Sequence, residues 1–352
     1  MTAKTLTDTI RFVKELAERE HHDSVNIIYH GGEPLTLSED RLRATSDMIR
    51  GALGHLELIE FVQSSFIPYR TSHGRFIKER CGGVVGASVD FKYRQIGGSN
   101  TVYLDLFMAK VKQARKEGLI VNPCMVPSIA ELGKEKSIID WFAANQFDTF
   151  FIERFNHFGD SLERPTNAEQ SEFMIRLFEC SMDRLVSGLP LPRNNVIAAS
   201  LNGVLYGEPG ERWGGNCQKD FIVVNPDGAL NTCPDRIEWE KDAGWPNTSE
   251  GVKTFQSSPI RLMWISEQAV THKEPHCHEC RYKTWCKSGC PITPNKPTGA
   301  EGECSGYQRY LNHVSDFVST HHGHSLATAY LNNSMVLHKQ WGGKHPGVMA
   351  HA

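Results

Sequence analysis

Apolar positions along the first half of the chain follow two alternating patterns. Between Thr5 and Glu18 they recur three or four residues apart, which predicts an amphipathic helix. The mostly apolar run Val25-Asn-Ile-Ile-Tyr29 predicts a short buried strand. The two patterns then repeat, and they predict further helices at 41–53, 71–79, 102–116, 136–145 and 169–186, and further strands at 58–62, 83–89, 119–126 and 149–152.

Capping signals support two of these helices. Gly118 follows the helix at 102–116 and suits the left-handed position just past a helix end. Asn167 and Gln170 are spaced as a cap, so the helix at 169–186 is predicted to begin beside Asn167.

Strands that alternate with helices pair in parallel through right-handed crossovers. The sequence therefore predicts an α/β fold. A partial or complete (β/α) barrel is the best fit, and a doubly wound open sheet is the alternative. In either architecture the functional site lies at the carboxyl ends of the strands.

The pattern changes after residue 190. Glycine, proline and tryptophan become frequent, and helical spacing returns only at 307–318. The segment 221–233 predicts a hairpin that turns at Pro226-Asp227-Gly228. We therefore place a boundary at 190–210 and expect three parts: a first domain at 1–195, a cysteine-rich domain at 210–310, and a C-terminal helix with a tail at 311–352. The last forty residues hold seven of the sixteen histidines, including His321, His322 and His324, and we interpret them as a solvated, partly disordered tail.

The composition excludes several classes of protein. Lysine and arginine number 38 against 41 aspartates and glutamates, so the formal net charge is -3. This balance gives no electrostatic reason to expect nucleic acid or an anionic membrane as a partner. No run approaches the roughly 18 apolar residues of a membrane span, and the polar start lacks the apolar stretch of a signal peptide. We expect a cytoplasmic protein.

Seven of the ten cysteines lie in one quarter of the chain, at Cys217, Cys233, Cys277, Cys280, Cys286, Cys290 and Cys304. In a large intracellular chain such a concentration is more typical of metal ligands than of disulfides. Four thiolates complete one tetrahedral zinc site. Two [4Fe–4S] clusters take eight thiolates, so seven fit two clusters with one position open or filled otherwise. The spacing alone leaves both metals open.

This cysteine pattern resembles the SPASM auxiliary-cluster domain. The matching parts are Cys217, the run from Gly228 to Cys233, the C-x2-C-x5-C-x3-C motif from Cys277 to Cys290, and Cys304. The SPASM domain ends many radical S-adenosylmethionine (SAM) enzymes that modify peptides, including the anaerobic sulfatase-maturating enzymes.

The first half of the chain resembles the same family. The run Tyr29 to Leu35 contains Gly31-Gly32-Glu33-Pro34 after a predicted strand and is similar to the family's GGEP motif. Ser88-Val89-Asp90 resembles the motif of the fourth strand, and 147–154 fits the sixth. The resemblance covers about residues 1–310. It implies a partial (β/α)6 TIM-like radical SAM barrel that lacks its first strand and cluster loop, followed by a SPASM domain.

The resemblance also implies roles for individual residues. Cys217, Cys233 and Cys290 would hold the auxiliary cluster nearer the barrel, which keeps an open iron or recruits an oxygen ligand such as Asp235. The distal cluster would be held by Cys277, Cys280, Cys286 and Cys304. Gly31, Gly32, Glu33 and Pro34 would bind the amino end of SAM, with Ser88, Asp90 and Arg94 contacting the rest. On physical grounds, two glycines let the backbone approach a ligand, and a carboxylate beside them can receive an ammonium group.

The family's C-x3-C-x2-C motif, whose cluster cleaves SAM, does not occur in the sequence. Three explanations stay open: a truncated or mis-started reading frame, a cluster loop supplied by another chain, and a descendant without that cluster. Truncation is favoured because the GGEP motif and all seven SPASM cysteines remain in place. As written, the chain is not expected to cleave SAM reductively.

The predicted function is therefore a radical SAM/SPASM-type oxidoreductase that modifies a peptide or protein substrate. It would carry two auxiliary [4Fe–4S] clusters, bind SAM and receive electrons from a donor. In its complete form the family uses a 5′-deoxyadenosyl radical. Two other hypotheses are a non-catalytic iron–sulfur protein that binds peptides or transfers electrons, and a structural zinc protein with its site between Cys277 and Cys290.

Overall fold

The computed structural model describes residues 1–155, 163–209, 213, 217–236, 246, 250–270, 274–290, 292–294 and 296–340. The chain divides into two compact units, each built from two stretches of sequence. Unit 1 comprises Met1–Cys124 and Cys217–Met263, and unit 2 comprises Met125–Asn216 and Trp264–Ala352. The predicted domains at 1–195, 210–310 and 311–352 are consecutive segments, and they stay a prediction.

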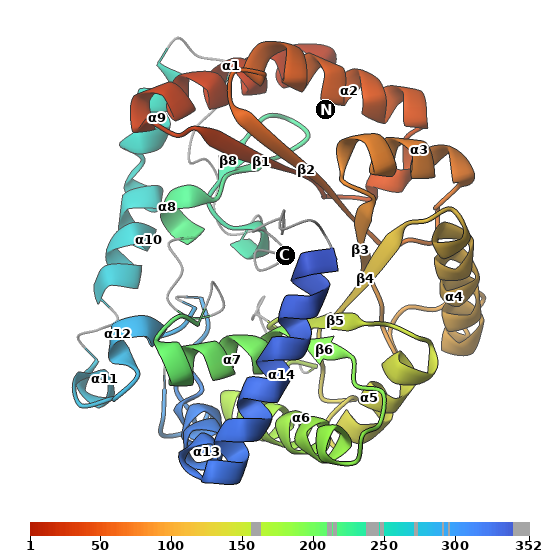
Figure 1. Cartoon of the computed structure of the whole chain (residues 1–352). Helices are drawn as coiled ribbons and strands as arrows, with labels where there is room; N and C mark the ends of the chain where they lie inside the picture. Colours follow the sequence, from red (N-terminus) through yellow and green to blue (C-terminus); the bar gives the residue numbers. More distant parts are fainter. Residues whose placement is uncertain are drawn as a thin grey trace. The chain divides into compact units, whose positions relative to one another are not determined.

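The first stretch of unit 1 alternates helices and strands, as the hydrophobic pattern predicts (Figure 1). Its four strands pair in chain order and in parallel: β1 with β2, β2 with β3, and β3 with β4. The elements are α1 (Ala3–Glu20), β1 (Ser24–Tyr29), η1 (Pro34–Thr36), α2 (Glu39–Leu53), β2 (Glu57–Ser64), α3 (Thr71–Arg80), β3 (Val84–Ser88), α4 (Asn100–Lys116) and β4 (Ile120–Met125).

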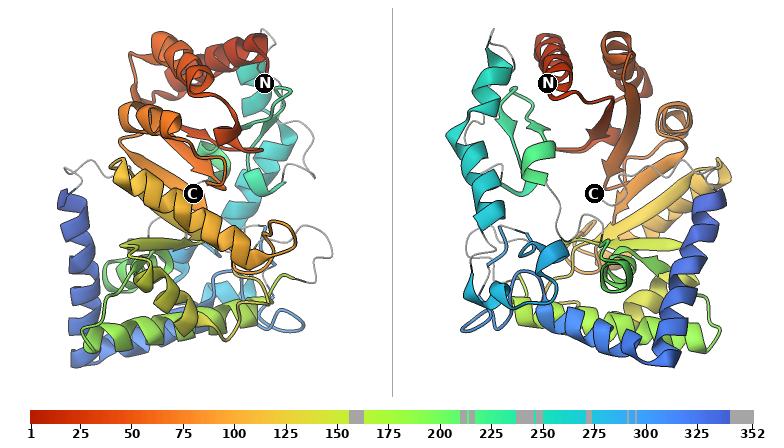
Figure 2. Two further views of the ribbon diagram at one scale, coloured as in Figure 1. Left: turned by 90° about the vertical axis from the view of Figure 1, so that its right-hand side faces the viewer. Right: turned by 60° about the vertical axis from the view of Figure 1, so that its left-hand side comes forward.

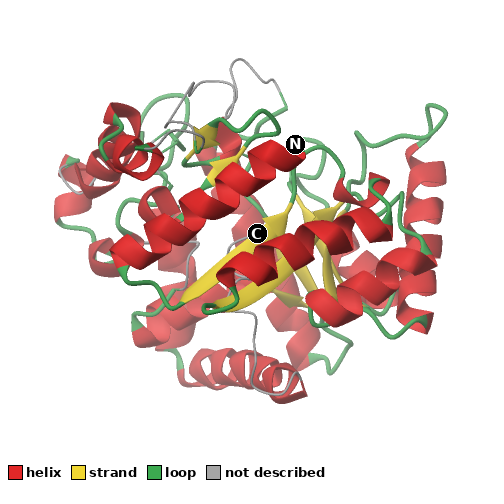
Figure 3. Ribbon diagram, turned by 90° about the horizontal axis from the view of Figure 1, so that it is seen from above, coloured by secondary structure: helices red, strands yellow, loops and turns green. Residues whose placement is uncertain are grey.

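The second stretch of unit 1 completes a hydrophobic core with the first. Phe12 of α1 meets Phe255 edge-on, with ring centroids 5.4 Å apart, and Leu230 and Val252 are buried in the same cluster. On its other side α1 packs against α2. Seen from above, helices lie in front of the strands (Figure 3). The predicted hairpin is confirmed as an antiparallel pair of two short strands. The elements of this stretch are α8 (Cys217–Asp220), β7 (Val223–Val224), β8 (Leu230–Asn231), η2 (Pro234–Arg236), α9 (Gly251–Gln256) and the first residues of α10 (Pro259–Val270), whose remainder from Trp264 on is assigned to unit 2.

Unit 2 contains the last two parallel strands, which pair at Thr149–Arg193 and Phe150–Asn194. The strand order of the six-stranded sheet is β1-β2-β3-β4-β5-β6, which confirms the predicted α/β class. No helix in the described ranges is long and apolar enough to cross a membrane. The elements of unit 2 are α5 (Glu135–Ala144), β5 (Thr149–Ile152), α6 (Asn167–Val186), β6 (Arg193–Asn194), α7 (Asn195–Tyr206), α11 (Pro275–His278), α12 (Lys283–Cys286), α13 (Gln308–Ser319) and α14 (His321–Gln340).

The predicted cap of α6 is wrong by one residue. Thr166 is the N-cap, and it forms a capping box with Glu169: the Glu169 amide donates to the Thr166 hydroxyl at 3.2 Å, and the Glu169 carboxylate accepts from the Thr166 amide at 2.8 Å. Because Thr166 satisfies the first turn, the Asn167 side chain is released for contacts elsewhere.

Several helices were not predicted. α9 and α10 lie in the stretch where helical spacing was expected to be absent, and α7 and α14 lie in the expected boundary and tail. α7 occupies the segment taken as a domain boundary, although Asn194 caps it and Gly207 ends it at a φ of 73°. α14 occupies much of the predicted tail and leaves α13 in a new direction (Figure 2). His321, His322 and His324 are exposed as expected, but Ala327, Tyr330 and Leu331 form a buried stripe that holds the helix in unit 2. Residues 341–352 of the predicted tail lie outside the described residues.

Candidate metal centre and ligand-binding turn

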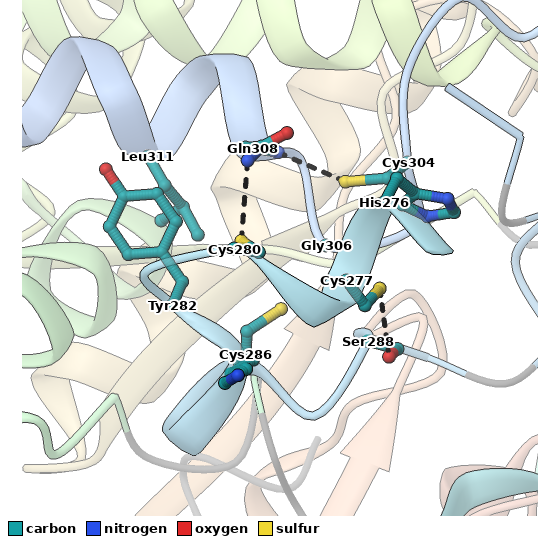
Figure 4. A pocket seen from close by; sticks show the side chains of 11 residues that line it. His276, Cys277, Cys280, Tyr282, Cys286, Ser288, Cys304, Gly306, Gln308 and Leu311 are labelled. Atoms are coloured by element: carbon teal, nitrogen blue, oxygen red, sulfur yellow. Dashed lines mark hydrogen bonds between the residues drawn. The ribbon is translucent and has the colours of Figure 1, made fainter. Parts of the chain in front are cut away.

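One pocket in unit 2 is lined by four of the seven clustered cysteines: Cys277, Cys280, Cys286 and Cys304 (Figure 4). Cys277 lies in α11, Cys286 ends α12, and Cys304 precedes α13. Three of the four are buried, with exposed fractions of 7–8%. These are the cysteines that the resemblance assigns to the distal cluster, and Cys290 does not line the pocket.

The chain returns to this pocket through an unusual turn. Lys287, Ser288 and Gly289 follow Cys286 with φ values of 46°, 65° and 71°, all in the left-handed region. A non-glycine residue in that region costs on the order of 1–3 kcal/mol, and such strain concentrates at functional sites. The turn brings the Ser288 hydroxyl within 3.4 Å of the Cys277 sulfur, to which it donates.

Gly306 lies against two of the sulfurs. A Cβ at this position would stand 2.5 Å from Cys286 Sγ and 3.8 Å from Cys304 Sγ. Its carbonyl accepts from Trp213 Nε1 at 2.9 Å, which fixes the backbone there. The absence of a side chain therefore leaves the sulfurs room that any other residue would fill.

The loop that carries Cys304 is held by Glu303 and by Asn167 at the start of α6. The Glu303 carboxylate, which is buried, accepts from the Cys304 amide at 2.8 Å and from the Arg309 amide at 3.0 Å. The Asn167 side chain donates to the carbonyls of Pro294 and Glu303, at 2.6 and 3.2 Å. The start of α6 thus clamps the loop that carries the last cysteine.

Burial changes the acidity of two thiols in the pocket. Burial raises the pKa of Cys286 to about 12, although the nearby Arg154 guanidinium opposes this. Burial, followed by the charge of Glu303, also raises the pKa of Cys304. Both thiols are therefore neutral at pH 7 until a metal displaces their protons.

The geometry of the four cysteines around this pocket bears on which metal they could hold. Zinc binds thiolates at about 2.3 Å, so a tetrahedral zinc site needs its sulfurs within about 4 Å of one another. Among the described residues, no three His, Cys, Asp or Glu side chains form a group that could hold one ion. A [4Fe–4S] cluster takes each thiolate on a different iron, so it does not require all four sulfurs to converge on one ion.

The other three cysteines fall in different units. Cys217 begins α8 and is exposed, and Cys233 follows β8 and is half-buried, both in unit 1. Cys290 is half-buried in unit 2. Their common cluster therefore stays a prediction. Asp235 is the oxygen ligand suggested for this cluster. Its negative charge also affects His30, which follows β1: burial lowers the pKa of His30, and the charge of Asp235 opposes this decrease.

The predicted SAM-binding turn lies at the carboxyl end of β1. Gly31 and Gly32 have φ values of 71° and 58°, which only glycine adopts without strain. Apart from their chain neighbours, no atom of the described residues lies within 4 Å of where their Cβ atoms would be, and both glycines are exposed, so this backbone is accessible to a ligand.

The Glu33 carboxylate is used within the turn itself. Oε1 accepts from the Leu35 amide at 3.1 Å and from the Ser64 hydroxyl at 2.6 Å, while Oε2 accepts from the amide and hydroxyl of Ser65. These four donors match the roughly four acceptor sites of a carboxylate. Burial alone would raise the pKa of Glu33, but the hydrogen bonds outweigh it and lower that pKa. The structure thus gives Glu33 the task of tying the turn to the end of β2.

Glu33→Gln is expected to destabilise the protein by about 1–3 kcal/mol, because an amide NH2 would face donors that need an acceptor. The folded pKa is lowered, so the stabilisation is present above the ordinary pKa and is lost as pH falls through the folded value. Denaturant unfolding at pH 7 and pH 3 measures both effects. Glu57→Gln, on the exposed start of β2, is the matched control. An equal effect of the two substitutions at pH 7 would contradict this role.

The remaining predicted SAM contacts, Ser88, Asp90 and Arg94, gather around Tyr103. The Tyr103 hydroxyl donates to the Ser88 carbonyl at 3.1 Å, and burial raises its pKa to about 12 while Arg94 lowers it and Asp90 raises it. Asp90 Oδ1 accepts from the amides of Lys92, Tyr93 and Arg94. Asp90 therefore organises the loop after β3, and its contact with SAM stays a prediction. Sequence reasoning missed Tyr103, which no motif marks.

Comparison with solved structures finds close agreement in fold. The anaerobic sulfatase-maturating enzyme anSMEcpe, with bound AdoMet and the Kp18Cys peptide, matches at a TM-score of 0.73 and 16% identity, covering 94% of this chain and 91% of that one. SuiB from Streptococcus suis, bound to S-adenosylmethionine, matches at 0.54 and 16%, covering 83% and 67%. No protein-family model and no curated protein matches the sequence. Both neighbours are radical SAM/SPASM enzymes, and this chain has their fold.

Proposed function

We propose that the chain is a radical SAM/SPASM-type protein for the modification of a peptide or protein side chain. The observation that carries the proposal is the pocket that unites Cys277, Cys280, Cys286 and Cys304 and leaves out Cys290. Spacing along the sequence alone would favour the four consecutive cysteines Cys277, Cys280, Cys286 and Cys290 for a zinc site. The exchange of Cys290 for Cys304 is the ligand set that the SPASM resemblance implies. The shared fold supports the same conclusion.

The residues of the pocket fit a [4Fe–4S] cluster. Four thiols surround the space, and Gly306 leaves it clear of a Cβ. A cluster bound there supplies one-electron transfer. The protein holds the ligand loops through Glu303 and Asn167 and excludes water by burying three of the four cysteines.

The turn at Gly31 and Gly32 is the proposed site for SAM. The Glu33 carboxylate is already engaged by Ser64 and Ser65. The ammonium group of SAM would therefore donate to backbone carbonyls of the turn, which accept hydrogen bonds as a carboxylate does. Two auxiliary clusters, a peptide substrate and an electron donor complete the proposal.

Anaerobic reconstitution is expected to load about eight irons per chain, because seven thiolates match two [4Fe–4S] clusters. Iron and zinc are counted by metal analysis, with Cys180→Ser in α6 as a control that keeps its iron. Stoichiometric zinc without iron uptake would overturn the proposal. The loaded protein should also retain SAM in equilibrium dialysis, whereas iron uptake without SAM retention would favour an electron-transfer protein.

A further inference from the structure

Gln308 donates to two of the four cysteines in the pocket. Its backbone amide lies 3.4 Å from Cys304 Sγ, and its side-chain Nε2 lies 3.4 Å from Cys280 Sγ. Figure 4 shows both sulfurs on the side of the pocket where Gln308 stands. A third of the four cysteines, Cys277, accepts a hydrogen bond from the Ser288 hydroxyl.

Gln308 is held in this position by the start of α13. It is the first residue of that helix, so its amide belongs to the positive end of the helix dipole. Tyr307 before it is 1% exposed, adopts a φ of 57°, and donates from its hydroxyl to Gln170 of α6 at 3.0 Å. A buried, left-handed residue tied to a second helix leaves the first turn of α13 little freedom. The side chain of Gln308 is therefore aimed by its surroundings.

We propose that Gln308 is a positioning residue that sets the reduction potential of the cluster in the four-cysteine pocket. Reduction adds one electron, and the added negative charge spreads onto the sulfur ligands. A donor to sulfur stabilises the reduced form more than the oxidised form, so it raises the potential. The inference rests on the proposed function, since it requires a cluster at these cysteines.

The test is a redox titration of the reconstituted full-length protein, followed by electron paramagnetic resonance. Gln308→Met keeps the length of the side chain and removes the N–H donor without adding charge. It is expected to lower the equilibrium constant for reduction of one cluster about tenfold. For a one-electron couple this moves the corresponding redox transition about 59 mV to lower potential. Gln308→Glu replaces the donor with a negative charge and is expected to lower the same transition further.

Gln256→Met is the matched control, because Gln256 also donates from Nε2, but to Glu20 at 2.8 Å. It should leave every transition in place. If Gln308→Met and Gln308→Glu both load iron normally and no transition moves, the inference is wrong while the proposed function stands. If Gln308→Met fails to hold iron, Gln308→Glu decides alone, and an unchanged potential there refutes the inference. Absence of iron in the unmodified protein removes the proposed function itself.

Discussion

Gly306→Ala is expected to remove about half of the iron from the reconstituted protein, the share of one of two [4Fe–4S] clusters. The added methyl group would stand 2.5 Å from Cys286 Sγ, so the sulfur must leave its position. Gly306 does not have a positive φ, and alanine therefore suits its backbone. The expected loss comes from the sulfur contact and not from backbone strain.

Metal analysis and the visible charge-transfer absorbance measure this loss. Gly51→Ala is the control, because Gly51 lies in the interior of α2 and, outside its own helix backbone and chain neighbours, no atom of the described residues lies within 4 Å of its would-be Cβ. That substitution should keep all iron and stabilise the protein by roughly 0.5–1 kcal/mol. A Gly306→Ala protein with a full complement of iron would show that the cluster does not occupy this pocket.

The alternation of helices and strands was predictable because burial leaves a periodic record in the sequence. The boundaries of β1, α2, β2 and α4 agree within about two residues with the pattern. The two-residue strand β6 and the cap at Thr166 were not predictable in the same way. A strand of two residues has no period, and Thr166 competes with Asn167 for the same role until packing decides.

The residues of the candidate metal site were likewise only partly predictable from the sequence. The sequence pattern could single out Cys277, Cys280, Cys286 and Cys304 as one set, and these four line one pocket, because metal ligation restricts residue type and spacing. Their role as metal ligands stays a prediction. The residues that shape their surroundings could not be predicted, since Gly306, Gln308 and Glu303 act through contacts that the fold creates. Glu33 shows the converse. Its motif suggested a ligand contact, whereas its carboxylate is engaged by Ser64 and Ser65 on the neighbouring strand end, more than thirty residues away in sequence.

Cys280→Ala and Cys217→Ala are each expected to remove about half of the iron, and together nearly all of it. Cys280 lines the pocket with Cys277, Cys286 and Cys304, whereas Cys217 belongs to the set assigned by resemblance to the other cluster. Each thiolate serves one cluster only, so the two losses should add. Loss of all iron from either single change would indicate one coupled site.

The two single variants also identify which cluster Gln308 influences. Gln308 donates to Cys280, so the transition that Gln308→Met shifts should survive in Cys217→Ala and disappear in Cys280→Ala. Electron paramagnetic resonance of the four combinations measures this directly. A shifted transition that survives in Cys280→Ala would mean that Gln308 acts on the other cluster. The four-cysteine pocket would then lose its assignment as the site that Gln308 controls, even if the total iron content matched two clusters.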